Sequence, residues 1–275
     1  MGNFTSFALV VFALAVIWLV YRIASKHSSK NPPPNASTSA LGDKREHVSL
    51  EDNPPPNIST PVSPLPADEI LDSALFPEYA EILQARGIRY LTHFTNAGNL
   101  ENIFMFGLLS RKKLIRQNIS HKCSDSDRYD GSDAICTSVE FPNHRMFYYK
   151  RKQHQLDDWA VLWIDARVLM ERKARFFTSN AAGVNAFPLF GASGFEQLFH
   201  GSSRPPDLPP KFPTDSQAEV QIEDHIPWAR IKYVFFQNKR AYYKYCKFIP
   251  STVQVRVNSL PFESRDVFIE RSRKI

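Results

Sequence analysis

The chain has 275 residues, a net charge of +6 from 34 Lys and Arg against 28 Asp and Glu, and 43% hydrophobic residues. This length suits one ordinary folded domain with appendages, and the hydrophobic content excludes a wholly disordered or fibrous chain. Three cysteines without CxxC spacing favour neither a disulfide scaffold nor a closed zinc site, so no metal is expected.

The first predicted element is an apolar segment near the N-terminus. The run Phe7–Tyr21 contains no polar break and lies near the lower end of the ~17–25 residues that cross a bilayer. Arg22, Lys26 and Lys30 follow this run, and no Lys or Arg precedes it. A cleaved signal peptide, the alternative, would carry its positive charge before the apolar run. We therefore predict a retained transmembrane anchor over residues 1–23, with the rest of the chain in the cytoplasm.

Residues 24–67 differ abruptly in composition. Nine of the 20 prolines lie between Pro32 and Pro66, and most other positions are Ser, Thr, Asn or charged. Such a segment buries too little apolar surface to order itself. We predict a disordered Pro/Ser-rich linker over 24–67, followed by a folded domain over 68–275.

The folded domain is predicted to begin with a helix that ends at Gly87, followed by a strand over 88–95. Asn96 is a candidate N-cap for a helix over 97–106, and Gly107 is its stop signal.

The remaining elements are many short strands mixed with few helices. In chain order they are a polar, charged loop at 110–132, a strand at 134–138, a helix from the Asn143 cap through 152, a strand at 159–165, short segments at 175–178 and 195–199, a Pro-rich loop at 201–215, strands at 218–223 and 231–237, a helix at 239–247, and closing strands at 252–257 and 267–271. Without a regular βαβ rhythm, this order indicates an α+β fold.

Three residues attract attention as candidates for chemistry, although each also has an ordinary structural interpretation. His93 lies at a strand end, where a satisfied core histidine is common, and Glu219 lies in a strand, where a solvated carboxylate is common. Arg128 lies in an acidic loop, where surface ion pairs of little energetic weight form. No GxGxxG, P-loop, GxSxG or HExxH motif occurs, so a Rossmann-type cofactor is unsupported.

Three motifs taken together and in order give a more specific interpretation. They are His-Phe-Thr-x-x-x-Asn-Leu-x-x-Ile-x-x-x-Gly-Leu-Leu at 93–109, Phe-Pro-Asn-x-x-Met-Phe at 141–147 and Pro-Thr-Asp-x-Gln-Ala-Glu-Val at 213–220. The region from about Arg89 to Tyr245 resembles the DarT family of DNA ADP-ribosyltransferases, toxins of bacterial toxin–antitoxin pairs that modify bases of single-stranded DNA using NAD. The resemblance implies an ADP-ribosyltransferase-like split mixed β-sheet with small helices. The anchor and linker are not part of the family's pattern.

The resemblance also assigns roles to individual residues. Glu219 would hold the ribose 2′-OH of NAD and stabilise the oxocarbenium-like carbon, and Arg128 would contact NAD and take part in catalysis. His93 would bond the nicotinamide-side ribose, and the backbone of Phe94 would pair with the carboxamide. The full set implied to bind NAD is His93, Phe94, Thr95, Asn96, Ile103, Arg128 and Met146.

Other positions bear on the phosphates and on the acceptor. Lys112, Lys113 and Arg116 are either phosphate ligands or a solvated face. Gln217, two residues before Glu219, argues by resemblance against an arginine acceptor but does not separate thymine from guanine. Two aromatic residues are candidates to stack on a flipped base, with core packing as the alternative for each: Tyr148 and Phe199.

The resulting hypothesis is a membrane-tethered, toxin-type enzyme that transfers ADP-ribose from NAD to a thymine or guanine of single-stranded DNA. It implies a macrodomain-type ADP-ribosylhydrolase antitoxin as partner. Two alternatives stay open: transfer to protein or RNA, and a non-catalytic, membrane-anchored nucleic-acid-binding module.

Overall fold

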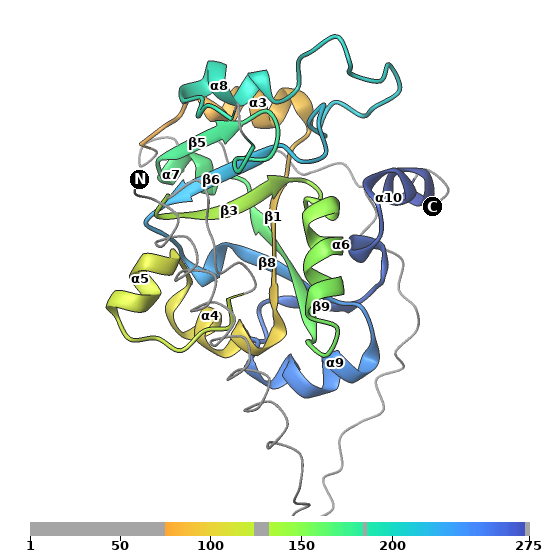
Figure 1. Cartoon of the computed structure of the whole chain (residues 1–275). Helices are drawn as coiled ribbons and strands as arrows, with labels where there is room; N and C mark the ends of the chain where they lie inside the picture. Colours follow the sequence, from red (N-terminus) through yellow and green to blue (C-terminus); the bar gives the residue numbers. More distant parts are fainter. Residues whose placement is uncertain (1–74, 124–131, 184–185, 273–275) are drawn as a thin grey trace, which may run out of the picture. The chain divides into compact units, whose positions relative to one another are not determined.

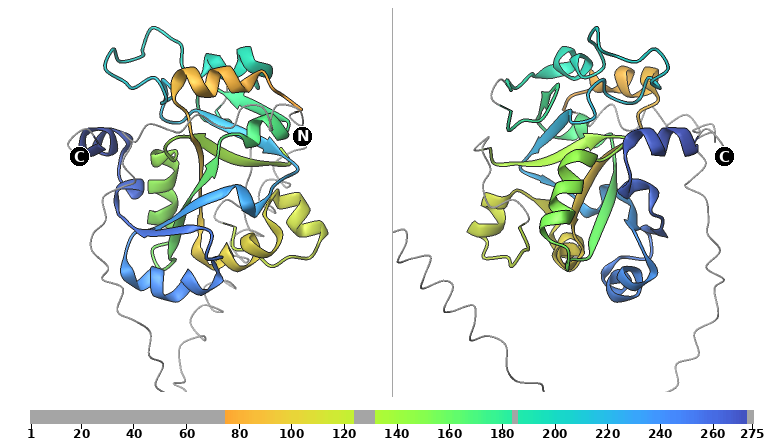
Figure 2. Two further views of the ribbon diagram at one scale, coloured as in Figure 1. Left: turned by 180° about the vertical axis from the view of Figure 1, so that it is seen from behind. Right: turned by 45° about the vertical axis from the view of Figure 1, so that its right-hand side comes forward.

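The computed structural model describes residues 75–123, 132–183 and 186–272 (Figures 1 and 2). The predicted anchor at 1–23, the linker at 24–67 and Arg128 lie outside these residues. Within them, no helix is both long and apolar enough to span a bilayer.

A mixed sheet forms the centre of the described domain, with the strand order β5-β6-β3-β1-β4-β8-β9. Neighbouring strands are antiparallel except β8 and β9, which run parallel. A small second sheet pairs β2 with β7. The strands are β1 Tyr90–Asn96, β2 Leu108–Leu109, β3 Ala134–Val139, β4 Trp159–Asp165, β5 Ala174–Phe177, β6 Glu219–Glu223, β7 His225–Ile226, β8 Ile231–Phe236 and β9 Gln254–Val257.

The main sheet is split between β1 and β3. Every residue of β1 is paired with β4, from Tyr90 opposite Asp165 to Asn96 opposite Trp159. Between β1 and β3, only Leu91 with Val139 and Thr92 with Ser138 are in register. The two strands therefore part beyond Thr92, and the sheet opens there. The α+β class predicted from the sequence, with a large mixed sheet, is confirmed.

Helices cover both faces of the sheet, which explains the apolar sequence of β4. Trp159, Val161 and Trp163 pack into one aromatic cluster, whereas Leu162 and Ile164 pack into the larger core on the other face. In Figure 1, α6 lies across one face, α3 and α8 lie beside β5, and α9 lies at the opposite end. The α-helices are α3 Tyr79–Arg86, α4 Leu100–Phe106, α5 Arg111–Arg116, α6 His144–Gln153, α7 Val168–Glu171, α8 Gly191–Gln197, α9 Lys239–Tyr245 and α10 Arg265–Ser272.

The predicted asparagine caps form as hydrogen bonds. Asn143 Oδ1 accepts from the backbone N–H of Met146 at 3.1 Å and begins α6. Asn96 Oδ1 accepts from the backbone N–H of Gly98 at 2.9 Å and begins the 3-10 turn η1, Ala97–Asn99, which leads into α4. Each cap satisfies a donor that the helix start would otherwise leave unpaired.

Gly107, which ends α4, is required for a steric reason. Its φ is +83°, and a Cβ atom built on it would lie 2.6 Å from the carbonyl oxygen of Ile226. Any other residue would therefore clash with the backbone of β7. The glycine lets β2, which follows at once, pair with β7.

One predicted element is wrong, and several elements of the structure were not predicted. Residues 267–271 form part of helix α10 and not a strand, because Ser264 caps this segment by accepting from the backbone N–H of Val267 at 3.3 Å. Phe268 and Arg265, three residues apart, turn inward together. The loop at 110–132 contains the unpredicted helix α5, which buries no residue and so leaves no apolar periodicity. Helices α7 and α8 also lie outside the predicted set.

Candidate active site

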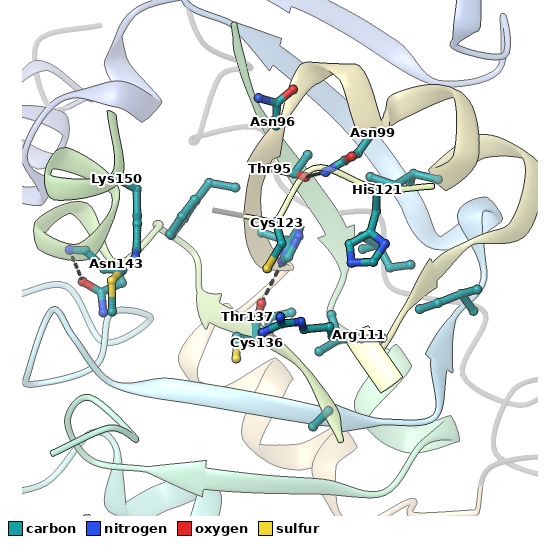
Figure 3. A pocket seen from close by; sticks show the side chains of 18 of the residues that line it. Thr95, Asn96, Asn99, Arg111, His121, Cys123, Cys136, Thr137, Asn143 and Lys150 are labelled. Carbon is teal, nitrogen blue, oxygen red and sulfur yellow. Dashed lines mark hydrogen bonds between the residues drawn. The ribbon is translucent and has the colours of Figure 1, made fainter. Parts of the chain in front are cut away.

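A pocket of about 270 Å³ opens where β1 and β3 part (Figure 3). Seven of the eight residues that the resemblance assigned to NAD binding or catalysis line it: His93, Phe94, Thr95, Asn96, Ile103, Met146 and Glu219. Arg128, the eighth, lies outside the described residues. The pocket thus gathers side chains from β1, α4, α6 and β6, which are far apart in sequence.

His93 stands on β1 immediately beyond its last pairing with β3. Its Nδ1 lies 2.8 Å from the carbonyl oxygen of Cys136 on β3. Because a carbonyl oxygen can only accept, Nδ1 carries the hydrogen and donates it. The imidazole therefore links the two strands where their backbone pairing has ended, and this contact holds the ring at the pocket wall.

Glu219 is the first residue of β6, on the other half of the split sheet. Its Oε1 accepts from Nε2 of Gln221 at 2.9 Å, and its Oε2 accepts from the backbone N–H of Ala181 at 3.4 Å. The carboxylate is half-buried and lines the same pocket as His93. The split sheet thus brings together the two residues on which the sequence interpretation depends most.

The Pro-Thr-Asp turn that leads into β6 is fixed by a buried arginine. Arg265 on α10 is only 8% exposed, and it donates to the carbonyl oxygens of Pro213 at 2.6 Å and Thr214 at 3.3 Å. Burial lowers the pKa of the Arg265 guanidinium, and the charges of Asp266 and Asp215 oppose that shift. Helix α10 therefore holds the turn that leads into β6.

Arg204 secures the Pro-rich loop before that turn. Its guanidinium donates to the backbone carbonyl oxygens of Leu208, Pro209 and Phe212, at 2.9 to 3.2 Å. A second contact, 3.4 Å long, reaches Oγ1 of Thr214. The Pro209 carbonyl oxygen also accepts from the backbone N–H of Phe212 at 3.1 Å. One side chain thus connects three carbonyl groups of a loop without regular secondary structure.

Two asparagines in the region of the first motif hold the segment 120–122 against the pocket. Asn99 Nδ2 donates to Thr95 Oγ1 at 3.1 Å and to the carbonyl oxygen of Lys122 at 2.9 Å, while its Oδ1 accepts from the Lys122 N–H at 2.7 Å. Asn102 Nδ2 donates to the carbonyl oxygen of Ser120 at 2.6 Å. The three bonds of Asn99 explain why the motif specifies an amide side chain at that position.

The charges around the pocket are unequal. Arg111 and Lys150 contribute cationic groups, as does Lys122, whose Nζ also lies 3.6 Å from Asp157 Oδ1. Glu219 is the one carboxylate among the described lining residues. Figure 3 shows Lys150 with Asn143 on one side and Arg111 with His121 on the other. Such an arrangement favours an anionic ligand, and phosphate groups are what Lys and Arg bind most readily. The sequence analysis did not single out these three cations.

Two of the three basic residues that the sequence analysis named at 112–116 are paired outside the pocket. Lys113 Nζ lies 2.5 Å from a carboxylate oxygen of Asp224, and Arg116 donates to Asp133 at 3.2 Å. Neither Lys113 nor Arg116 is among the residues that line the pocket.

The two aromatic candidates for base stacking, Phe199 and Tyr148, differ in exposure. Phe199 is 2% exposed and packs in the core, with the Arg86 guanidinium 4.3 Å from its ring centre. Tyr148 on α6 is 51% exposed. Phe94 stacks on Phe147, with ring centres 4.6 Å apart, so its side chain serves the core while its backbone remains at the pocket. Of the two aromatic candidates, Tyr148 is the exposed one.

The part of the chain that the structure describes contains no candidate metal site. There, no group of three or more His, Cys, Asp and Glu side chains is placed to hold an ion.

The fold and the pocket define a class of protein: an α+β protein with a pocket in the split of a mixed sheet, lined by cationic groups, by the carboxylate of Glu219 and by the imidazoles of His93 and His121. Residues 92–265, more than half of the chain, match the family model described as ssDNA thymidine ADP-ribosyltransferase, DarT. The chain belongs to the DarT family. The family and the enzyme class predicted from the sequence are thereby confirmed.

The solved structures that are similar to this chain have low sequence identity to it. Thermosipho africanus DarTG in complex with ADP-ribose is 16% identical, with a TM-score of 0.49, over 63% of this chain and 51% of that one. This chain therefore corresponds to about half of the DarTG chain. Thermus sp. 2.9 DarT in complex with NAD+ is 16% identical, with a TM-score of 0.46, over 64% of this chain and 98% of that one. The same Thermus protein in complex with ADP-ribosylated ssDNA gives 14% identity and a TM-score of 0.48, over 64% and 97% of the two chains. No curated protein matches.

Proposed function

We propose that this protein transfers ADP-ribose from NAD to a thymine base of single-stranded DNA. One observation carries the proposal: Glu219 and His93, from opposite halves of the split sheet, line a single pocket with cationic groups on both sides. Membership of the DarT family supports the same conclusion.

Glu219 is assigned the central role in the chemical step. The bond between the ribose C1′ and nicotinamide breaks, its electron pair leaves with nicotinamide, and C1′ becomes an oxocarbenium-like cation. A carboxylate that accepts a hydrogen bond from the 2′-OH stabilises that developing charge. A ring nitrogen of the acceptor base then forms the new bond to C1′ and releases its proton.

The other pocket residues are assigned to holding NAD. His93 bonds the nicotinamide-side ribose, and the Phe94 backbone pairs with the carboxamide. The pyrophosphate lies among the cationic groups, and the remaining predicted residues line the walls: Thr95, Asn96, Ile103 and Met146. Arg128 is proposed to contact NAD and assist catalysis.

The acceptor is assigned to the outer side of α6. The sequence of this helix, HRMFYYKRKQ, contains no acidic residue, and Tyr148 and Tyr149 are both exposed. Lys152 Nζ lies 5.6 Å from the Tyr148 ring centre. Exposed aromatic rings among cations are the features that bind single strands, because every base can stack and every nucleotide carries a phosphate. Met146 and Lys150 of the same helix reach the pocket.

The direct test incubates the full chain with NAD and oligonucleotides of defined base composition, then measures the mass and position of any adduct. We expect one ADP-ribose per modified thymine in single-stranded DNA. An adduct confined to guanine would replace the base, and an adduct confined to RNA or protein would replace the acceptor class. Failure to bind NAD would favour the non-catalytic alternative.

We also propose that residues 1–23 anchor the protein in a membrane and that the linker at 24–67 tethers a cytoplasmic domain over 68–275. The apolar run Phe7–Tyr21 and the basic residues after it support this arrangement. Alkaline washing of isolated membranes should leave the full chain bound. Its release into the wash would contradict the anchor.

A toxin of this kind requires a neutralising partner, and we propose a macrodomain-type ADP-ribosylhydrolase. Such a partner, encoded beside this gene, should remove the ADP-ribose from an oligonucleotide that this protein has modified. Persistence of the adduct would contradict the pairing.

A further inference from the structure

Gln221 is the polar side chain most completely withdrawn from solvent around the site. It lies on β6 two residues after Glu219, on the same face of the strand, and is 0% exposed. A buried amide is costly unless both of its ends are hydrogen-bonded. Its Nε2 donates to Glu219 Oε1 at 2.9 Å, and its Oε1 accepts from Arg175 Nε at 2.8 Å.

The sheet itself sets this chain of hydrogen bonds. Arg175 on β5 and Cys136 on β3 lie directly opposite Gln221 in the register of their strands. Phe177, two residues after Arg175, lies opposite Glu219. The backbone ladder of three strands therefore fixes where Arg175 and Gln221 stand, and no flexible loop is involved.

The chemistry of the three groups allows only one orientation of the amide. A guanidinium can only donate, and an ionised carboxylate can only accept. Gln221 must therefore turn its oxygen toward Arg175 and its nitrogen toward Glu219. A direct ion pair would place a full positive charge against the carboxylate. The intervening amide instead fixes the position of the carboxylate and leaves its negative charge for the substrate.

We propose that Gln221, oriented by Arg175, is the positioning residue that holds the Glu219 carboxylate for cleavage of NAD. This inference rests on the proposed function, in which Glu219 stabilises the ribosyl cation. It differs from the sequence interpretation, which gave weight to Gln217. That residue lies in the turn before β6, where its backbone N–H donates to Asp215 Oδ1 at 2.8 Å.

A second cavity makes the arrangement accessible to a chemical test. Arg175 and Gln221 line a space of about 240 Å³ that shares Ala181 and Ala182 with the main pocket. Arg175 is on β5, the edge strand of the sheet. A small guanidinium ion can therefore occupy the space that truncation of Arg175 would leave.

The first experiment measures nicotinamide release from NAD by full-length variants, a signal that requires no knowledge of the acceptor. Gln221→Leu should lower kcat ~10- to 100-fold, the scale expected when a catalytic group is misplaced. KM for NAD should stay within about twofold, because the ligand-binding groups are untouched. The matched control is Ile222→Val, which trims a fully buried neighbour on the other face of β6 and should keep kcat.

The second experiment asks whether Arg175 acts through Gln221. Arg175→Leu should lower kcat ~5- to 10-fold alone but less than about twofold in the Gln221→Leu background, because both changes break one chain of hydrogen bonds. Millimolar methylguanidinium should restore part of the activity of Arg175→Ala and none of that of Gln221→Leu.

The outcomes separate the two claims. If the wild-type chain releases no nicotinamide with any acceptor, the proposed function fails and the positioning role falls with it. If the wild-type chain is active, additive effects or an unchanged kcat in Gln221→Leu overturn the positioning role alone. Should Gln221→Leu fail to fold, rescue of Arg175→Ala by methylguanidinium decides the question, and absence of rescue counts against it.

Discussion

Strands β4 and β6 belong to the same sheet and are both largely buried, but they bury different kinds of atoms. All seven residues of β4 are buried, and its side chains alternate between two apolar clusters up to the terminal Asp165. The five residues of β6 include Gln221, which is fully buried, and Glu219, which is half-exposed to the pocket. Burial of apolar surface stabilises a fold, whereas a buried amide is tolerated only where its hydrogen bonds are complete. Of these two strands, the one with a fully buried amide side chain is the one that presents Glu219 to the pocket.

The largest expected effect is on β6. Replacing Glu219 with Gln keeps the shape of the side chain but removes the charge, so transfer of ADP-ribose should fall ~10³-fold, as when one transition-state contact is lost. The free energy of unfolding should fall by about 0.5–1.5 kcal/mol, because the new amide can accept only one of the two hydrogen bonds that Glu219 accepts. Nicotinamide release and urea unfolding measure the two quantities.

The matched control for Glu219 is Glu223→Gln, which alters the exposed carboxylate at the other end of β6. That variant should retain full activity. Equal losses in both variants would mean that the charge of the strand matters and not its position at the pocket.

The converse result is expected on β4. Leu162 is 0% exposed in the larger core, and Leu162→Ala should lower the free energy of unfolding by ~3 kcal/mol through lost apolar contact and the cavity left behind. Activity per folded molecule should persist at low temperature. A loss of activity without a loss of stability would break the contrast between the two strands.

A smaller effect is expected on α6, beside the pocket. Tyr148→Ala should weaken binding of a single-stranded oligonucleotide by ~1–3 kcal/mol, the usual worth of one stacked base, with NAD affinity unchanged. Fluorescence anisotropy measures the first and calorimetry the second. Tyr243→Ala on α9 is the control and should bind as the wild type does, because this tyrosine is also exposed, at 63%, and does not line the pocket.

The smallest effect concerns the acidic residues at the ends of the two strands. Burial acts to raise the pKa of Asp165 after β4's apolar run, but hydrogen bonds from Arg167 outweigh it and lower that pKa. Next to β6, hydrogen bonds from Lys113 and His225 lower the pKa of Asp224 to about 2. A lowered pKa contributes stability above the ordinary value of ~3.9 that is lost as the pH falls toward the folded-state value.

The side chain of Asp224 is 59% exposed, so Asp224→Asn should cost less than about 1 kcal/mol at pH 7. Urea midpoints of the variant and the wild type should converge between pH 4 and about 2, where the wild-type carboxylate becomes protonated. Midpoints that stay apart in acid would mean that Asp224 acts through its shape and not its charge.

Local signals predicted much of this domain correctly. The two asparagine caps, Asn143 and Asn96, bond to backbone within a few residues of themselves. Gly107 ends a helix, as glycine commonly does. These features could therefore be located from the sequence alone. Strand β4 was equally easy to predict from its apolar run. The strand predicted at 267–271 was wrong because the prediction gave more weight to the alternation of Val267 and Ile269 than to the cap at Ser264.

The site was predictable only in part. His93, Ile103, Met146 and Glu219 came from motif resemblance, and the pocket contains them all. Arg111, Lys122 and Lys150 are ordinary surface cations in the sequence, and only the packing of α5, α6 and the segment before Cys123 turns them toward one space. Gln221 and Arg175 could not be paired without the register of β5 on β6, which no local pattern encodes.

The bond from His93 to Cys136 has a consequence for the width of the gap between β1 and β3. It joins a side chain to a backbone carbonyl oxygen immediately past the last backbone pair of the two strands. A residue without a ring N–H at position 93 would remove this donor from the Cys136 carbonyl oxygen. The entrance of the pocket therefore depends on one side chain, whereas the rest of the sheet is held by its backbone ladder.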